Sequence, residues 1–151
     1  MSTTDLSEEL SRNFHALWDN FPFPVMLTRK DRTVLDRNRA AEARGFAPGT
    51  RCSDLGEKGD HAGCLANAAL REQVGKRVVG YVAPLGKVLD TYWIPVVGHD
   101  DLYLHFSTDI TEYAADRLLP AGCVKGVLPG ELGCADTCGS GSELCGSCTG
   151  G

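Results

Sequence analysis

Strand-like segments occur in two blocks, with a helical and loop-rich segment between them. The first block holds Pro24–Arg29 and Thr33–Asp36, joined by a polar turn at residues 30–32, and predicts a hairpin. The second block holds three more strands, predicted at Arg77–Leu85, Val88–Val97 and Leu102–Asp109. Strands arranged around a helical insert predict an α+β fold, with a five-stranded antiparallel sheet and helices on one face.

The last of these strands shows the clearest alternation. Apolar Leu102, Leu104 and Phe106 alternate with Tyr103, His105 and Ser107. This period of two is typical of a strand with one buried face. We therefore expect His105 to point away from the apolar side chains.

Three segments are predicted to be helical. Residues 5–21 place an apolar residue every three or four positions, which is the pattern of an amphipathic helix, and Asp5 can cap it. Its apolar face can pack on its own sheet or form a dimer contact, and the pattern leaves both open. Shorter helices are expected at Asn38–Arg44, ended by Gly45, and at Cys64–Gln73, with a loop over residues 47–64.

Charge and hydropathy exclude some function classes. The net charge is −5, so the chain lacks the clustered positive charge that nucleic acid requires. No apolar run approaches the ~20 residues of a membrane span, and the N-terminus does not resemble a signal peptide. A cytoplasmic protein without a membrane partner is expected.

Composition changes after Pro120. The last thirty residues hold half of the 18 glycines and five of the seven cysteines, and they contain no aromatic residue. Such a segment buries too little apolar surface to offset its ordering entropy. The expected organisation is an N-terminal helical segment at 1–22, a domain at 23–117 and a Gly/Cys-rich tail at 118–151.

Three motifs in this order resemble those of PAS domains, over about residues 10–115. The first runs from Val34 to Ala41 and is followed by Gly45; it is a strand that ends in Asn38, before a helix of small residues. The second is Asp90–Val96, and the third is Phe106–Glu112, which contains Asp109-Ile110-Thr111. The chain is thus similar to bacterial sensory PAS domains.

The resemblance implies a five-stranded antiparallel sheet with a helix-lined pocket on one face. It further implies a small-molecule ligand, a homodimer or signalling partner contacted by the N-terminal helix, and signal transmission at Asp109, Ile110 and Thr111. Haem and flavin are not expected, because neither a Cys-x-x-Cys-His motif nor an Asn-Cys-Arg-Phe-Leu-like run is present.

Cys52, His61 and Cys64 form a candidate ligand or redox loop. Some bacterial PAS domains carry a Gly-x-x-Cys start followed by His and a Cys pair here, and this chain resembles a variant with His61 in place of one cysteine. Thiolate and imidazole are soft metal ligands, but these residues leave a tetrahedral site one ligand short. The alternative is that Cys64 is a small core residue and His61 a surface loop residue.

The tail places Cys134, Cys138, Cys145 and Cys148 at Cys-x3-Cys and Cys-x2-Cys spacing. Four such thiols can hold zinc or an iron–sulfur cluster. The Cys145–Cys148 pair can also undergo dithiol chemistry, and free thiols in a flexible tail are the third interpretation.

No nucleophile–base motif, phosphate loop or dinucleotide fingerprint occurs, so an enzyme is not expected. The sequence predicts a small ligand- or redox-responsive sensory module that acts through dimer or partner contacts. The alternatives are a metal or iron–sulfur carrier that uses the tail cysteines, and a dithiol redox protein.

Overall fold

The computed structural model describes residues 7–55 and 61–120. Within them the helices are α1 (Glu8–Trp18), α2 (Arg39–Ala43) and α3 (Ala66–Glu72), and the strands are β1 (Val25–Arg29), β2 (Val34–Arg37), β3 (Lys76–Val82), β4 (Lys87–Pro95) and β5 (Leu102–Asp109). None of these helices is long and apolar enough to cross a lipid bilayer.

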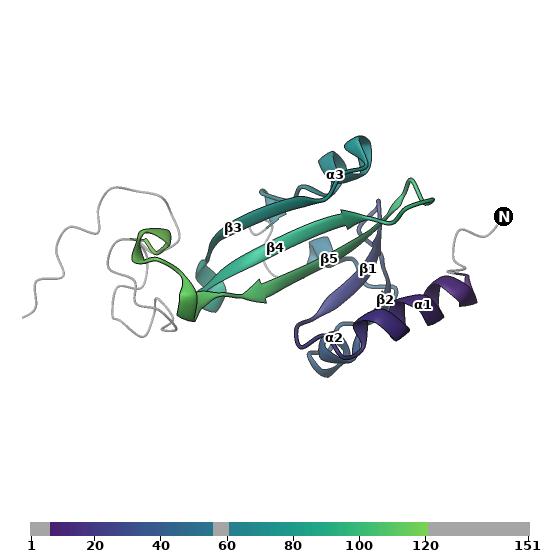
Figure 1. Ribbon diagram of the computed structural model, residues 1–151, viewed down its shortest axis with the longest axis horizontal. Coiled ribbons are helices and arrows are strands. Elements are labelled where there is room, and N and C mark those ends of the chain that lie inside the picture. Colours follow the sequence, from purple (N-terminus) through teal and green to yellow (C-terminus); the bar gives the residue numbers. More distant parts are fainter. Residues whose placement is uncertain (1–6, 56–60, 121–151) are drawn as a thin grey trace, which may run out of the picture. The chain divides into compact units, whose positions relative to one another are not determined.

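The five strands form one sheet in the order β2-β1-β5-β4-β3 (Figure 1). Strand β1 is antiparallel to β2 on one side and to β5 on the other. The predicted α+β fold with a five-stranded antiparallel sheet is confirmed. The chain divides into two compact units, residues 1–77 with 91–107 and residues 78–90 with 108–151. The predicted division at residues 22 and 117 stays a prediction.

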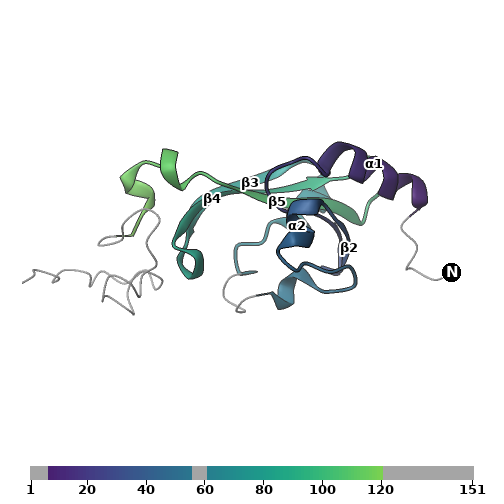
Figure 2. The ribbon, with the colours of Figure 1, turned by 90° about the horizontal axis from the view of Figure 1, so that it is seen from below.

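Helix α1 covers one face of the sheet in the first unit, opposite α2 (Figure 2). Ser7 caps it by accepting a hydrogen bond from the backbone N–H of Leu10, so the helix begins at Glu8. Phe14 is 4% exposed and packs with Val25 and Leu27 of β1. The helix ends at Trp18 instead of Phe21, because the chain turns there toward β1. Asp5 lies outside the described residues.

Helices α2 and α3 cover the other face. Along β1 the side chains alternate, so Met26 packs with Ala41 of α2, while its neighbours Val25 and Leu27 face α1. Along β5, Tyr103 packs with Ala66 and the rest of α3. This part of the sheet is therefore buried on both faces.

A β-bulge interrupts the pairing of β1 with β2. Leu27 pairs with Asp36 and Thr28 pairs with Val34, so Leu35 is the extra residue. Because of the bulge, Val34 faces α2 while Asp36 lies on the α1 side.

Strands β3 and β4 differ from their predicted bounds at their ends. The strand predicted for Arg77–Leu85 ends at Val82 and is followed by a 3-10 turn at Ala83–Leu85. Pro84 has no N–H to donate to a sheet, and Gly86 adopts a positive φ of 61°, which together form a turn. Strand β5 has the predicted bounds.

Candidate functional site

A group of thiol, phenol, indole and imidazole side chains surrounds Tyr103 of β5, on the α3 face of the sheet, and is the candidate functional site. We call Tyr103, Cys52, Cys64, Trp93 and His105 the Tyr103 cluster. Tyr103 is fully buried, and its hydroxyl oxygen lies 3.9 Å from the Cys52 Sγ. Trp93 packs beside Tyr103 under α3, and Cys64 packs against the same group.

The Cys52 thiol and the Tyr103 phenol are held in their protonated forms. Burial raises the pKa of the Cys52 thiol; the Tyr103 hydroxyl lowers it and Cys64 raises it. Burial, together with Cys52, also raises the pKa of Tyr103 far above its ordinary value. A protonated buried thiol is a poor nucleophile and a poor metal ligand. In this state Cys52 therefore acts as a packed, weakly hydrogen-bonding group.

His105 belongs to the same cluster. It lies on the opposite face of β5 from Leu104 and Phe106, as predicted, but that face is also apolar. Its ring stacks on Trp93 with 5.2 Å between centroids, and Nδ1 donates to the Tyr92 carbonyl at 3.0 Å. Burial lowers the pKa of His105. His105 thus points away from Leu104 and Phe106, as predicted, but it is buried all the same, because both faces of the sheet are covered here.

Arg32 completes the surroundings of Tyr103 and was missed from the sequence. It lies in the turn between β1 and β2 with a φ of 77°, a conformation that is strained for a residue with a side chain. Its guanidinium carbon lies 5.9 Å from the centre of the Tyr103 ring, and Nη2 donates to Asn67 of α3 at 3.1 Å. The polar turn was predicted, but neither its backbone conformation nor these contacts could be read from residue types.

Of the three residues of the predicted Cys52–His61–Cys64 loop, the two cysteines lie beside Tyr103. Cys52 is buried and Cys64 is half-buried, and both are free thiols. His61 Nε2 donates to the Leu55 carbonyl at 2.6 Å. In residues 7–55 and 61–120, no three His, Cys, Asp or Glu side chains converge to hold a metal ion. The role of the loop stays a prediction, and Cys134, Cys138, Cys145 and Cys148 lie outside the described residues.

The predicted transmission residues form a compact hydrogen-bonded group at the end of β5. Thr111 Oγ1 donates to Asp109 Oδ1 at 2.6 Å and accepts from the backbone N–H of Val88 at 3.0 Å. The backbone N–H of Ile110 donates to the Val88 carbonyl, and Lys87 Nζ lies 2.7 Å from Asp109 Oδ2. This Asp109–Thr111 clasp therefore joins the end of β5 to the beginning of β4.

The clasp holds Asp109 as a carboxylate. Burial alone would raise its pKa, but the hydrogen bonds from Lys87 and Thr111 outweigh burial and lower the pKa to about 2. Because the folded pKa lies below the unfolded value of about 3.9, this contribution to stability is complete above pH 4. It is lost as the pH falls through about 2.

Replacing Thr111 with valine is expected to raise the pKa of Asp109 toward its ordinary value, because one of its donors, the Thr111 hydroxyl, disappears while the backbone N–H of residue 111 remains. The backbone N–H of Val88 also loses its acceptor, so the free energy of unfolding falls by about 1–2 kcal/mol. Carboxyl carbon NMR and urea unfolding measure the two effects. Thr50→Val is the control, because its exposed hydroxyl bonds only to the Ala47 carbonyl. An unchanged Asp109 pKa in Thr111→Val would contradict the role of the hydroxyl.

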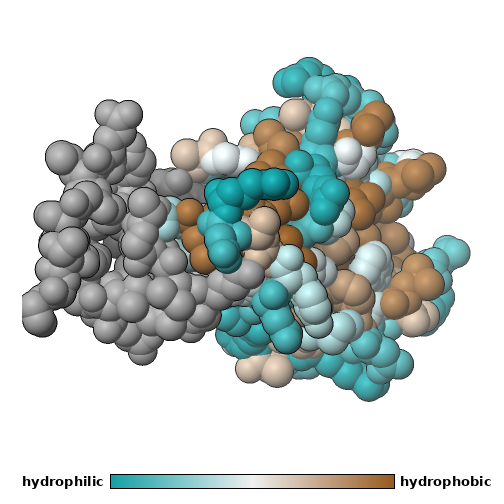
Figure 3. Space-filling view, turned by 60° about the vertical axis from the view of Figure 1, so that its left-hand side comes forward, coloured by the Kyte–Doolittle hydropathy of each residue, from teal (hydrophilic) through white to brown (hydrophobic). Residues whose placement is uncertain are grey.

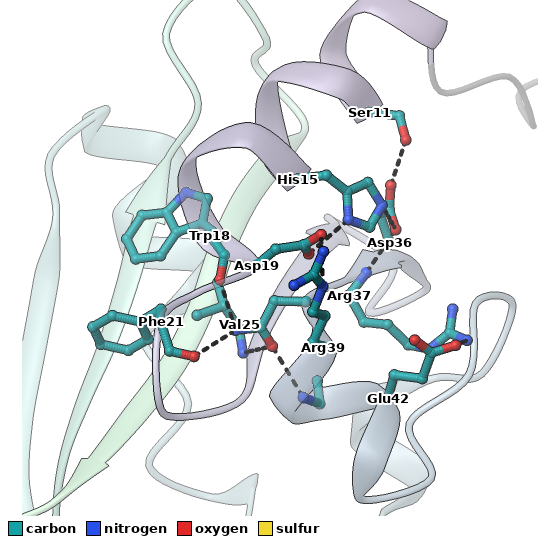
Figure 4. Close-up of polar contacts among 12 residues, drawn as sticks. Ser11, His15, Trp18, Asp19, Phe21, Val25, Asp36, Arg37, Arg39 and Glu42 are labelled. Carbon is teal, nitrogen blue, oxygen red and sulfur yellow. Dashed lines mark hydrogen bonds and ion pairs between the residues drawn. The ribbon is translucent and has the colours of Figure 1, made fainter.

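A second polar group joins α1, β1, β2 and α2 (Figure 4). Asn38, the α2 N-cap, is fully buried; Oδ1 accepts from the backbone N–H groups of Val25 and Ala41. Its Nδ2 donates to the carbonyls of Trp18, Phe21 and Phe23. The motif drew attention to Asn38, but its contacts across the fold were not predicted.

No known family model matches the sequence, and no curated protein matches it. A domain of an HTR-like protein from Haloarcula marismortui is 22% identical over 59% of this chain and 98% of that chain, with a TM-score of 0.50. A sensory box sensor histidine kinase from Vibrio cholerae is 20% identical over 62% of this chain and 83% of that chain, also at 0.50. The PAS domain of Bordetella pertussis BvgS is 19% identical over 68% and 83% of the two chains, at 0.44.

Similarity at this level of identity establishes the fold alone. The chain has a PAS-like fold, as its sequence motifs implied.

Proposed function

We propose that this chain is a non-catalytic, cytoplasmic sensory module in which a ligand or thiol oxidation acts on the Tyr103 cluster. The observation that carries the proposal is the composition of β5. The strand presents Tyr103 and His105 to the α3 face and supplies Asp109 to the clasp at its end. A change in the packing of Tyr103 would shift β5, and Asp109 of the clasp belongs to the same strand.

The thiols support a redox input. Cys52 and Cys64 both raise the pKa of Tyr103, and the Cys52 Sγ lies within weak hydrogen-bonding distance of the Tyr103 hydroxyl, at 3.9 Å. Oxidation of Cys52 and Cys64 breaks two S–H bonds and forms one disulfide bond. The two electrons and two protons pass to an oxidant of the diazene class, such as diamide, whose N=N bond is reduced to a hydrazine. The new bond would remove the S–H that faces Tyr103 and displace the phenol.

The output of the proposed module is a contact with a second copy or a signalling partner. Large apolar side chains are exposed at Leu17, Val97 and Tyr113, at 77%, 96% and 82%. On the face shown in Figure 3, brown apolar patches are interspersed with teal hydrophilic ones. Scattered apolar residues are ordinary on protein surfaces, so they support a partner contact without defining its site.

The redox input is tested on a chain in which the five tail cysteines are serine, so that Cys52 and Cys64 are the remaining thiols. Diamide is the oxidant, and backbone amide NMR is the readout. We expect oxidation to shift the amide signals of Tyr103 through Thr111, and Cys52→Ala to abolish the shift. If β5 and the clasp do not respond while the two thiols are consumed, the redox input is wrong.

The carrier alternative is tested on the full chain purified without oxygen. Metal analysis and an absorption spectrum distinguish a charge-transfer band of iron–sulfur from colourless stoichiometric zinc. Metal that is lost in Cys145→Ser and leaves the β5 amides unchanged would favour a carrier over a sensor. A bound metal or small molecule that shifts the β5 amides would support the sensory proposal.

A further inference from the structure

His15 of α1 lies between two carboxylates from different elements. Its Nδ1 is 2.8 Å from Asp19 Oδ1, one turn further along α1, and its Nε2 is 3.0 Å from Asp36 Oδ1 of β2 (Figure 4). The Asp36 side chain is only 11% exposed, whereas that of His15 is 42% exposed. The imidazole therefore bridges the helix to the edge of the sheet.

The geometry favours the protonated form of His15. A carboxylate oxygen lies beside each ring nitrogen, and only the imidazolium carries an N–H group on both nitrogens. A neutral ring would direct one lone pair at a carboxylate oxygen. The hydrogen bond to Asp19 accordingly raises the pKa of His15, with burial opposing it and Asp36 adding to it.

The neighbouring charged groups do not replace this bridge. Arg39 of α2 has its Nε 3.5 Å from Asp19 Oδ2, and Arg37 of β2 is paired with Glu42 of α2 at 2.9 Å. Asp36 also accepts from Ser11 Oγ at 2.6 Å and from the backbone N–H of Arg37 at 2.8 Å. When His15 is neutral, these contacts still serve the two carboxylates, but the charged link from α1 to β2 is lost.

We infer that His15, Asp19 and Asp36 form a proton-operated latch that fastens α1 to β2. The latch is closed when His15 is charged and opens as the pH rises. Because the folded pKa of His15 lies above the unfolded value of about 6.5, the stabilisation is complete below pH 6.5 and is lost as the pH rises through the folded pKa.

The open latch loosens α1 without unfolding the sheet. Phe14 remains packed with Val25 and Leu27, and Trp18 contacts the Phe106 ring at 5.4 Å between centroids. These contacts do not titrate. The latch lies on the α1 face, whereas the Tyr103 cluster faces α3, so this inference does not depend on the proposed function.

The test is NMR titration of the four histidines of the full chain, combined with amide hydrogen exchange of α1 from pH 5.5 to 8.5. After correction for intrinsic exchange rates, we expect the protection of α1 amides to fall at least about threefold as His15 deprotonates. In Asp36→Asn the His15 pKa should fall, and in His15→Gln the protection should become independent of pH. His99→Gln is the matched control, because His99 lies in an exposed turn.

Two results would overturn the latch. One is a His15 pKa at or below 6.5 in the unaltered chain, which needs no variant to fold. The other is a pH-dependent loss of α1 protection that persists in His15→Gln, which would place the titrating group elsewhere.

Discussion

Replacing Asn38 with alanine is expected to lower the free energy of unfolding by about 3–5 kcal/mol, the largest effect of any polar substitution proposed for this chain. The side chain bonds to two backbone N–H groups and three carbonyls, which belong to the end of α1, the segment between α1 and β1, the first residue of β1 and the first turn of α2. Alanine removes this partner from all five groups, although the Trp18 carbonyl still accepts from the backbone N–H of Phe21. Urea unfolding monitored by circular dichroism measures the loss.

Two further variants make the interpretation specific. Asn38→Asp retains the acceptor for Val25 and Ala41 but places a second oxygen against three carbonyls, so it should be as destabilising as alanine. Asn67→Ala removes an exposed amide that bonds to Arg32 and should change stability by less than about 0.5 kcal/mol. A loss of only about 1 kcal/mol in Asn38→Ala would mean that the residue acts as an ordinary helix cap.

The second large effect is expected for Phe14→Ala, which should cost about 3–5 kcal/mol. Phe14 is the buried residue of α1 and packs with β1 on the α1 face of the sheet. Its removal leaves a cavity and weakens the attachment of the whole helix. The free energy of unfolding and the amide protection of residues 8–18 report the two consequences.

Leu17→Ala is the matched control for Phe14→Ala. Leu17 lies on the same helix but is 77% exposed, so its removal should leave the stability of the monomer nearly unchanged. A dimer formed through the outer surface of α1 would instead be weakened by Leu17→Ala, which sedimentation at several concentrations would detect. The pair therefore separates packing on the sheet from dimerisation, the two roles that the sequence left open. A small effect of Phe14→Ala on stability would contradict the packing role.

The elements of the fold were predictable because their signals are local. The alternation from Leu102 to Asp109 defined β5, and Asn38 before a run of small residues marked the beginning of α2. The order of strands around the helical insert then identified the fold class. Boundaries shifted where a turn depended on a hydrogen-bond donor elsewhere in the chain, as at the end of α1, where Asn38 Nδ2 donates to the carbonyls of Trp18 and Phe21.

The candidate sites were less predictable, because they depend on contacts between distant residues. His15 and Asp36 are far apart in the sequence and meet only when α1 packs on β2. His105 points away from Leu104 and Phe106 as predicted, but alternation only distinguishes two faces and does not say whether the second is covered. The spacing of Cys52, His61 and Cys64 suggested soft ligands, but spacing alone does not determine whether their side chains converge.

The extra residue Leu35 places the two neighbouring residues of β2, Val34 and Asp36, on opposite faces of the sheet. Val34 supports the interior beneath α2, while Asp36, only two positions later, serves the opposite side. In a regular strand, residues two positions apart face the same side of the sheet, so Val34 and Asp36 would both face either α1 or α2. Because of the bulge, a substitution at Asp36 can alter the hydrogen bonding to α1 without changing the face on which Val34 packs.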